Sequence, residues 1–210
     1  DRTYGSRDPK HDNAMTYGGY SKRIVADQGF VLSVPPSLDI KAAAPLLCAG
    51  ITTWSPLRHW NVGHGDEVAV IGLGGLGHMG VKFAVALGAK VTVITTSPSK
   101  ADDARKLGAH DVVVSTDTES MQGAMNRFHF ILNTIPVSHD VNPYIPLLKR
   151  DGAMVIVGAL DPLSENLQTG AIIMGRRRIA GSIIGGIKET QEMLEFCGEH
   201  SVLPEVEMIE

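Results

Sequence analysis

A glycine-rich loop is the feature of this sequence with the most specific chemical meaning. The segment Gly72-Leu73-Gly74-Gly75-Leu76-Gly77 matches the pattern G-x-G-x-x-G and directly follows an apolar run at residues 68–71. In this pattern Gly72 permits a tight turn, Gly74 lets a pyrophosphate approach the backbone, and Gly77 lets the next helix pack close to its strand. The free N–H groups of a helix N-terminus also attract phosphate. The segment therefore predicts a dinucleotide-binding loop; the alternative is a glycine-rich turn kept only for close packing.

The end of the second predicted strand indicates which dinucleotide this loop binds. A free ribose 2′-hydroxyl is usually held by Asp or Glu about 20 residues beyond the loop, but the sequence has no carboxylate from His78 through Ala101. Hydroxyls and a lysine at this position suit a 2′-phosphate, which a carboxylate would repel. The predicted contacts are Thr95, Thr96, Ser97 and Lys100. They favour NADP(H) over NAD(H) and argue against S-adenosylmethionine; the alternative is a polar turn with a serine N-cap.

The pattern of apolar runs predicts the elements that position the loop. Short continuous apolar runs are typical of strands covered on both faces, and helical spacing with glycine stops predicts helices between them. The predicted strands are 68–71, 91–94, 111–114, 128–132, 153–157 and 179–184, and the predicted helices are 76–87, 100–107, 144–148, 172–174 and 189–200. This order predicts an α/β fold, a doubly wound (Rossmann) parallel sheet with helices on both faces.

The segments outside this alternation are less regular. Residues 1 to about 20 are polar and glycine-rich, and residues 23–25 and 30–34 suggest two short strands stopped by prolines. The small apolar residues 42–50 predict a buried helix with a proline in its first turn. Residues 202–209 suggest a strand without a partner.

Composition excludes several classes of protein. The 210 residues are 43% hydrophobic and 20% charged, as in an ordinary globular protein, and the net charge of −4 gives no electrostatic footprint for nucleic acid or an anionic membrane surface. No stretch approaches the roughly 20 apolar residues of a membrane helix. Two cysteines cannot build a disulfide framework, and no leader precedes them, so a cytoplasmic location is expected. The opening without Met and the unpartnered last strand predict a fragment.

Longer motifs indicate a family. The run Ala44-Pro45-Leu46-Leu47-Cys48-Ala49-Gly50-Ile51-Thr52-Thr53-Trp54-Ser55-Pro56-Leu57, the glycine loop with His78-Met79, and Ser97-Pro98-Ser99-Lys100 together resemble the zinc-dependent medium-chain alcohol dehydrogenases. The most similar branch is the cinnamyl-alcohol-dehydrogenase-like one. Shorter similar segments lie near both ends, at 18–21, 179–186 and 189–192.

This resemblance implies site residues and domains. Cys48 corresponds to a ligand of the catalytic zinc, and Thr52 to a catalytic-site residue against the nicotinamide. Backbone near the nicotinamide corresponds to the segments at Thr134 and Ile135, at Val157 and Gly158, and at Ser182, Ile183 and Ile184. Residues 1–40 correspond to a remnant of the all-β catalytic (GroES-like) domain, 41–200 to the NADP-binding Rossmann domain, and 201–210 to the start of the return to the catalytic domain.

The sequence departs from the family pattern at the metal. A catalytic zinc takes three protein ligands; in the family the others, a Cys and a His followed by Glu, lie in an amino-terminal domain, as do the four Cys of its structural zinc site. Neither set occurs here. Cys197 is interpreted as a buried structural thiol and His64 as a surface-loop residue. Without the resemblance, Cys48 alone would be interpreted as a core cysteine.

The expected function is that of an oxidoreductase acting on a small-molecule alcohol or aldehyde. The parent is expected to interconvert a primary alcohol and its aldehyde, with NADP(H) carrying hydride and zinc acting as a Lewis acid. The chain alone is expected to bind zinc weakly and to turn over no alcohol. The alternatives are a non-catalytic dinucleotide-binding module and a zinc-free quinone reductase. A homodimer through the last strand, 179–184, is expected by analogy, with no nucleic-acid or membrane partner.

Overall fold

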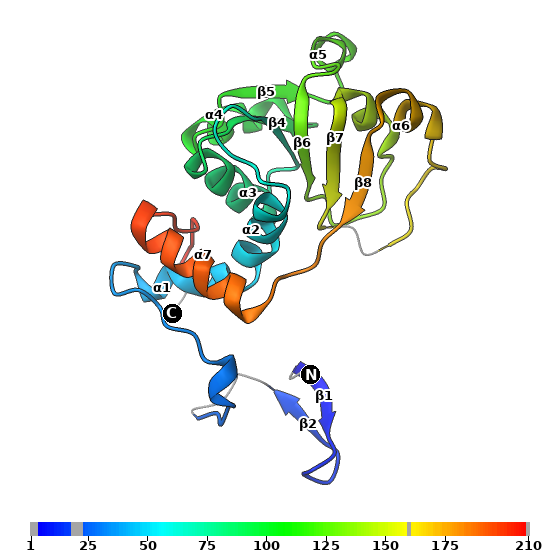
Figure 1. Ribbon diagram of the computed structural model, residues 1–210. Coiled ribbons are helices and arrows are strands. Elements are labelled where there is room, and N and C mark those ends of the chain that lie inside the picture. The colour runs from blue at the N-terminus through cyan, green and yellow to red at the C-terminus, as the bar shows by residue number, and fades with distance from the viewer. Residues whose placement is uncertain (1–3, 18–22, 159–160, 209–210) are drawn as a thin grey trace. The chain divides into compact units, whose positions relative to one another are not determined.

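The computed structural model describes residues 4–17, 23–158 and 161–208 (Figure 1). Contacts within the chain divide it into two units, Asp1–Leu32 and Ser33–Glu210. The division falls near the predicted boundary at residue 40, but the assignment of the first unit to a catalytic domain stays a prediction.

The first unit contains a two-stranded antiparallel sheet that the sequence pattern did not indicate. Strands β1 (Tyr4–Asp8) and β2 (Ala14–Tyr17) pair across a turn in which Asp12 and Asn13 have positive φ angles of 51° and 54°. Short polar residues tolerate this conformation, which explains why this polar segment can reverse direction.

The two strands predicted at 23–25 and 30–34 are wrong. These residues form no strand, and a 3₁₀ turn, η1 (Gln28–Phe30), lies between and partly within them. The Asp27 carboxylate accepts a hydrogen bond of 2.8 Å from the Gly29 N–H. This local capping bond favours a turn over an extended strand.

A six-stranded parallel sheet forms the centre of the second unit, in the order β5-β4-β3-β6-β7-β8 (Figure 1). Its strands are β3 (Glu67–Ile71), β4 (Lys90–Thr95), β5 (Asp111–Val114), β6 (Phe128–Asn133), β7 (Leu148–Ile156) and β8 (Arg178–Gly181). The strand order reverses between β3 and β6, the point at which doubly wound sheets bind ligands. The predicted Rossmann fold is confirmed.

Helices connect and cover these strands. They are α1 (Ile40–Ala43), η2 (Ala44–Leu47), α2 (Ala49–His59), α3 (Gly75–Ala86), η3 (Pro98–Lys100), α4 (Ala101–Lys106), α5 (Thr118–Gly123), η4 (Asn142–Leu147), α6 (Thr169–Gly175) and α7 (Ile187–His200). Helix α3 lies very close to the sheet, because a Cβ on Gly80 would be 2.8 Å from Leu132.

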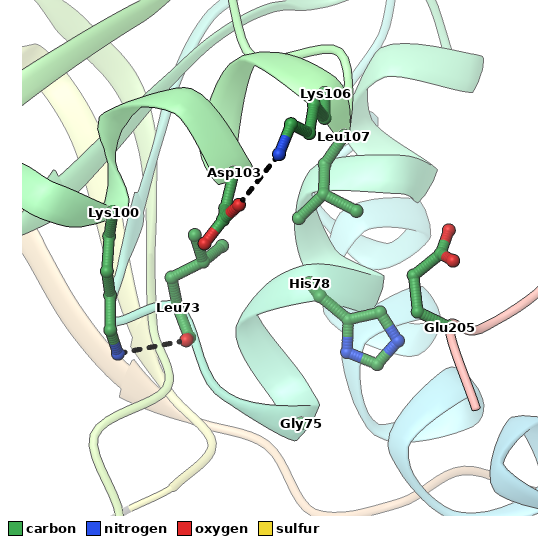
Figure 2. A pocket seen from close by; sticks show the side chains of 8 residues that line it. All are labelled: Leu73, Gly75, His78, Lys100, Asp103, Lys106, Leu107 and Glu205. Carbon is green, nitrogen blue, oxygen red and sulfur yellow. Dashed lines mark hydrogen bonds and ion pairs between the residues drawn. The ribbon is translucent and has the colours of Figure 1, made fainter. Parts of the chain in front are cut away.

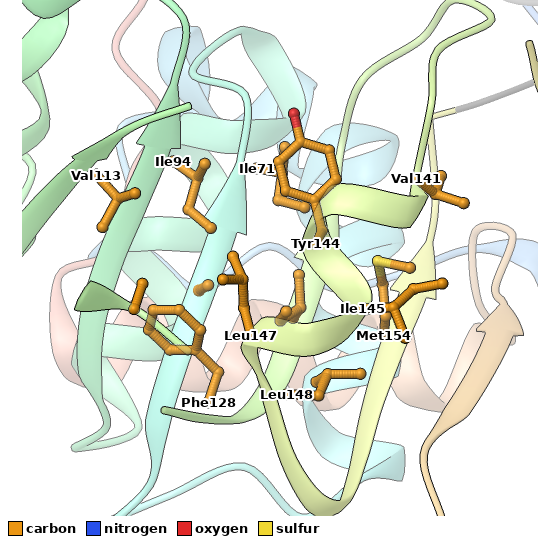
Figure 3. Packing of buried hydrophobic residues seen from close by; sticks show 13 residues of the cluster. Ile71, Ile94, Val113, Phe128, Val141, Tyr144, Ile145, Leu147, Leu148 and Met154 are labelled. Atoms are coloured by element: carbon orange, nitrogen blue, oxygen red, sulfur yellow. The ribbon is translucent and has the colours of Figure 1, made fainter. Parts of the chain in front are cut away.

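The opposite face of the sheet carries a hydrophobic core cluster (Figure 3). Side chains of alternate strand residues, among them Ile71, Ile94 and Ile131, pack there against Tyr144, Ile145 and neighbouring residues of η4. Both faces are therefore covered, as the continuous apolar strands predict.

The segment before the sheet corrects the predicted helix at 42–50. It is split into α1 and η2, and Cys48, with φ −129° and ψ −74°, separates them from α2. Helix α2 was not predicted because Thr52, Thr53 and Pro56 have low helix propensity. Burial of Ile51, Trp54 and Leu57 on its inner side outweighs that propensity.

Two further differences concern short segments. Helix α5 was not predicted; it begins at an Asp117 cap that accepts a 3.1 Å hydrogen bond from the Glu119 N–H. The strand predicted at 202–209 is wrong over 202–208, which form no strand. The Lys82 ammonium instead donates a hydrogen bond of 2.6 Å to the Leu203 carbonyl.

Ion pairs join the amino-terminal ends of the strands. Arg127 donates to Glu67 at 3.1 Å and to Asp111 at 2.7 Å, and Lys90 donates to Glu67 at 3.0 Å. Partial burial opposes ionisation of both carboxyl groups, but the hydrogen bonds from Arg127, and from Lys90 to Glu67, outweigh it. The pKa of Glu67 and the pKa of Asp111 therefore lie below their usual values.

We expect Arg127→Gln to lower the free energy of unfolding by about 1–2 kcal/mol at pH 7, because Arg127 bonds two carboxylates. Because the pKa values of Glu67 and Asp111 are lowered, their ionised forms stabilise the fold at pH values above the unfolded-state pKa values of about 4. This stabilisation is lost as the pH falls through the folded-state pKa values. The variant should therefore lose less stability in acid than the wild type. Urea titrations between pH 3 and 7 measure both effects.

Arg105→Gln is the matched control, since the Arg105–Asp102 pair has side chains 61% and 84% exposed. We expect it to cost less than about 0.5 kcal/mol. Equal losses of unfolding free energy in the two variants would show that the partly buried ion pairs of Arg127 stabilise the fold no more than an exposed pair does.

Candidate functional site

The glycine loop joins the end of β3 to the start of α3. Gly72 has a positive φ of 88° and donates its N–H to the Ile94 carbonyl at 3.0 Å. Gly74 caps the helix, and its carbonyl accepts the His78 N–H at 2.9 Å. The loop therefore turns the chain directly from the strand into the helix, and the N–H groups of the first helical turn are left without partners inside the helix.

The glycines differ in what surrounds them. A Cβ on Gly77 would lie 2.1 Å from the Gly72 carbonyl oxygen, so packing alone requires glycine there. A Cβ on Gly74 or Gly75 would meet nothing within 4 Å. These two positions line open space, and the absence of side chains there leaves room for a bound group to approach the backbone.

The predicted 2′-phosphate contacts lie at the end of β4 and in the turn after it. Thr95 is 7% exposed, and its hydroxyl oxygen accepts the Ser97 N–H at 3.2 Å, whereas Thr96 is exposed. The exposed Lys100 ammonium donates to the Leu73 carbonyl at 3.3 Å. The lysine therefore lies beside the glycine loop, with the hydroxyl-bearing turn adjoining it in sequence.

A cavity of about 480 Å³ lies against this loop. One wall is formed by the loop from Gly72 to Leu76 together with Lys100. The other wall is formed by the segment after β6, which consists of Thr134, Ile135 and Pro136. The cavity lies where the order of the strands reverses. The polar side chains of its lining are the Lys100 ammonium and the Thr134 hydroxyl.

A second cavity, of about 580 Å³, shares Leu73, Gly75 and Lys100 with the first (Figure 2). It continues between α3 and α4 to His78, Leu107 and Glu205. Asp103 and Lys106 form an ion pair of 3.3 Å in its lining. The Nε2 atom of His78 is buried, and no hydrogen-bond partner for it occurs within the described residues.

The other predicted strand-end residues lie at the same edge of the sheet. Val157 and Gly158 follow β7, and Ser182, Ile183 and Ile184 follow β8. The Ser182 N–H donates to the Ile156 carbonyl at 3.1 Å, and Ile183 is 77% exposed. The parallel strands bring these residues to the edge that carries the glycine loop.

Cys48 and Thr52 lie at the start of α2. Cys48 is exposed, and its carbonyl accepts the Thr52 N–H at 3.0 Å; Thr52 itself is 7% exposed. Across 4–17, 23–158 and 161–208, no group of three His, Cys, Asp or Glu side chains could hold a metal ion. The described residues thus offer one accessible thiol but do not complete a zinc site.

The two residues interpreted as non-ligands have the expected surroundings. Cys197 is buried, and burial raises the pKa of its thiol to about 12. His64 is exposed in the turn before β3.

Several lining residues were not predicted. Ile135, which the family resemblance indicates, and Pro136, which it does not, both line the first cavity. The signal that could have found Pro136 is its position shortly after the strand at which the sheet order reverses. Asp103, Lys106 and Glu205 line the second cavity, and only the tertiary packing of α4 and the last segment brings them there.

Among the residues that the structure describes, no helix is long and apolar enough to cross a bilayer.

Comparisons with known proteins agree with this architecture. NADP-dependent alcohol dehydrogenase C 1 of Mycolicibacterium smegmatis is 51% identical over 207 residues, covering 99% of this chain and 58% of that protein. A cinnamyl alcohol dehydrogenase structure from Sorghum bicolor has a TM-score of 0.91 and 44% identity, covering 98% of this chain and 58% of that one. The CAD protein of Helicobacter pylori, solved with NADP(H), has a TM-score of 0.86 and 41% identity, and the match covers 99% of this chain and 59% of that one. The chain thus spans less than two thirds of the length of these relatives.

A family model confirms the assignment that the sequence motifs suggest. The model described as zinc-binding dehydrogenase matches residues 75–199, from the glycine loop to the end of α7. This is more than half of the chain, so the chain belongs to the zinc-binding dehydrogenase family.

Proposed function

We propose that this chain provides the NADP(H)-binding part of a zinc-dependent alcohol dehydrogenase or aldehyde reductase that acts on primary alcohols and their aldehydes. The observation that carries the proposal is the cavity of about 480 Å³ between the glycine loop, Lys100 and the segment after β6. The relatives described above include an NADP-dependent alcohol dehydrogenase and a structure solved with NADP(H).

The glycine loop is proposed to bind the pyrophosphate. A Cβ on Gly74 or Gly75 would occupy the open space beside the helix N-terminus, so the shape of the loop fits a group that approaches the backbone closely. The free N–H groups and the helix dipole favour a negative charge there.

The 2′-phosphate is proposed to bind beside Lys100. The Lys100 ammonium is exposed and lies next to the loop, at hydrogen-bond distance from Leu73. Thr96 and Ser97 add hydroxyl groups, and no carboxylate occupies the β4 end. The buried Thr95 hydroxyl orients the turn through its bond to Ser97.

The nicotinamide is proposed to extend toward β7, β8 and the start of α2. NADP(H) supplies the hydride when it is bound. Thr52 would form part of the surface against the nicotinamide ring, and the backbone of Val157, Gly158 and residues 182–184 would hold its far side. These residues orient the ring and exclude water.

Cys48 is proposed to contribute one thiolate ligand to a zinc ion. Its exposure at the end of η2 allows this, whereas the remaining ligands would lie outside the described residues. Residues 1–40 and 201–210 are proposed to belong to the catalytic domain, and residues 41–200 form the proposed nucleotide-binding domain. A homodimer is proposed to join edge strands β8.

A non-catalytic dinucleotide-binding module is the second candidate. The incomplete set of metal ligands within the described residues favours it. Metal analysis and activity of a longer protein containing this chain distinguish the two candidates.

We expect the chain to bind NADPH roughly ten- to a hundredfold more tightly than NADH, because one charge-assisted hydrogen bond contributes about 1.5–3 kcal/mol. Lys100→Met should remove most of this preference, and added salt should narrow it in the wild type. Thr96→Asp should reverse it, since Thr96 is exposed in the same turn and its carboxylate would bond the ribose diol and repel the phosphate. Fluorescence titration with both reduced cofactors measures the effect.

Lys188→Met is the matched control, because Lys188 has a 92% exposed side chain on α7. We expect it to change neither affinity. Equal affinity of the wild type for NADPH and NADH would mean that residues 95–100 form only a polar turn.

We expect Gly74→Ala to weaken NADPH binding at least about tenfold while lowering stability by no more than about 1 kcal/mol. The added Cβ meets no protein atom but enters the space proposed for the pyrophosphate. Gly77→Ala should instead destabilise the fold by about 2–3 kcal/mol through its clash with Gly72. Gly123→Ala, which also meets nothing within 4 Å, controls for the added methyl group. Undiminished NADPH binding by Gly74→Ala would place the pyrophosphate elsewhere.

We expect the 210-residue chain, dialysed after incubation with zinc, to retain well below one zinc per chain and to oxidise no alcohol. One thiolate does not replace a three-ligand site. Elemental analysis and an NADPH-formation assay check this, with Cys48→Ser as the control for thiol-dependent binding. Zinc-dependent turnover by this chain alone would contradict the proposed division of ligands.

A further inference from the structure

Thr134 makes an unusual set of contacts with the end of β3. Its backbone N–H and its hydroxyl both donate to the Ile71 carbonyl, at 3.0 Å and 2.8 Å, and the hydroxyl oxygen lies 3.3 Å from the Gly72 carbonyl oxygen. Its side chain is buried, with the residue 6% exposed. One residue thus occupies both acceptor positions of the Ile71 carbonyl, which fixes the peptide plane between Ile71 and Gly72.

This peptide plane determines where the glycine loop begins. The Thr134 hydroxyl oxygen would lie 3.1 Å from a Cβ on Gly72 and 3.2 Å from a Cβ on Gly77. It therefore contacts the first and the last glycine of the loop at the point where α3 packs on β3.

Thr134 also begins the opposite wall of the 480 Å³ cavity, which continues through Ile135 and Pro136. This wall is held in place separately. The Asn133 side chain accepts the Ile135 N–H at 3.2 Å, and a Cβ on Gly158 would be 2.5 Å from the Thr134 carbonyl oxygen. The Thr134 hydroxyl is thus a polar connection between a fixed wall and the glycine loop.

We propose that Thr134 is a positioning residue for dinucleotide binding, whose hydroxyl sets the distance between the glycine loop and the wall after β6. This inference rests on the proposed function, because it concerns how the same cavity holds a dinucleotide. The hydroxyl acts on the loop that holds the pyrophosphate, a group common to NADPH and NADH. Removal of the hydroxyl therefore weakens the binding of NADPH and of NADH by the same factor. Removal of the Lys100 ammonium, in contrast, should weaken mainly the binding of NADPH.

The experiment compares Thr134→Val, Thr134→Ala and Thr134→Ser in the full 210-residue chain. The valine methyl group cannot stay 2.8 Å from an oxygen, because C–H···O contacts need about 3.3–3.6 Å, so the loop must move. We expect Val and Ala to weaken NADPH and NADH binding each by roughly three- to tenfold. Ser, which retains the hydroxyl, should restore affinity to within about twofold of the wild type.

Thr92→Val is the matched control, on strand β4 of the same sheet. Thr92 is 0% exposed, and its hydroxyl has no hydrogen-bond partner within the described residues. This isosteric change should leave both affinities unchanged. Thermal unfolding of each variant without cofactor should shift by less than about 4 °C, because the Thr134 N–H still satisfies the Ile71 carbonyl.

The outcomes separate this inference from the proposed function. If the wild type binds NADPH, and Thr134→Val and Thr134→Ala bind it as tightly, the inference is overturned and the proposed function is not. A loss that Ser does not restore, or one that Thr92→Val reproduces, also overturns it. No dinucleotide binding by the wild type overturns the proposed function and this inference with it. If Thr134→Val does not fold, Ala and Ser provide the same comparison.

Discussion

The close contact between the start of α3 and the end of β3 constrains the structure at the carboxyl ends of the parallel strands. At its closest point, Gly77 has no side chain, and a Cβ there would be 2.1 Å from the Gly72 carbonyl oxygen. Because the helix begins so close to its strand, its unpaired N–H groups lie where the strand order reverses. Lys100 donates a hydrogen bond to the Leu73 carbonyl in this loop, and Thr134 donates one to the Ile71 carbonyl at the end of β3. The cavity is thus lined by the glycine loop on one side and by Thr134, Ile135 and Pro136 on the other, with Lys100 as the one charged side chain among the described residues that line it.

The elements predicted well from sequence are those in which local pattern and tertiary burial agree. Strand β3 is a continuous apolar run from Val68 to Ile71, and β4 is rich in β-branched residues; they are buried from Val68 to Ile71 and from Val91 to Thr95. Helix α2 was missed because its threonines and Pro56 oppose a helix locally, and only packing of its apolar side favours one. The strand predicted at 202–209 failed for the opposite reason: its apolar pattern has no neighbouring strand to pair with over 202–208.

The candidate site was predictable where a residue type is required by backbone geometry. The positive φ of Gly72 and the tight packing of Gly77 leave a recognisable pattern in the sequence. Ile135 and Pro136 leave no such pattern, since many apolar residues could line that wall. The side-chain contact of Thr134 with the glycine loop joins residues more than sixty positions apart, and sequence spacing gives no information about such a contact. The roles proposed for Cys48 and Thr52 rest only on family resemblance, because one exposed thiol has no ligand geometry of its own.

The ion pairs around Arg127 and the glycine loop lie at opposite ends of the same short strands. Strand β3 has five residues, which at about 3.3 Å per residue separates the two ends by roughly 15 Å. This distance exceeds the screening length at physiological ionic strength and the range over which substitutions usually interact. Free-energy changes at the two ends are therefore additive. The carboxyl ends can be redesigned for a different nucleotide without loss of the electrostatic anchoring that holds the amino ends together.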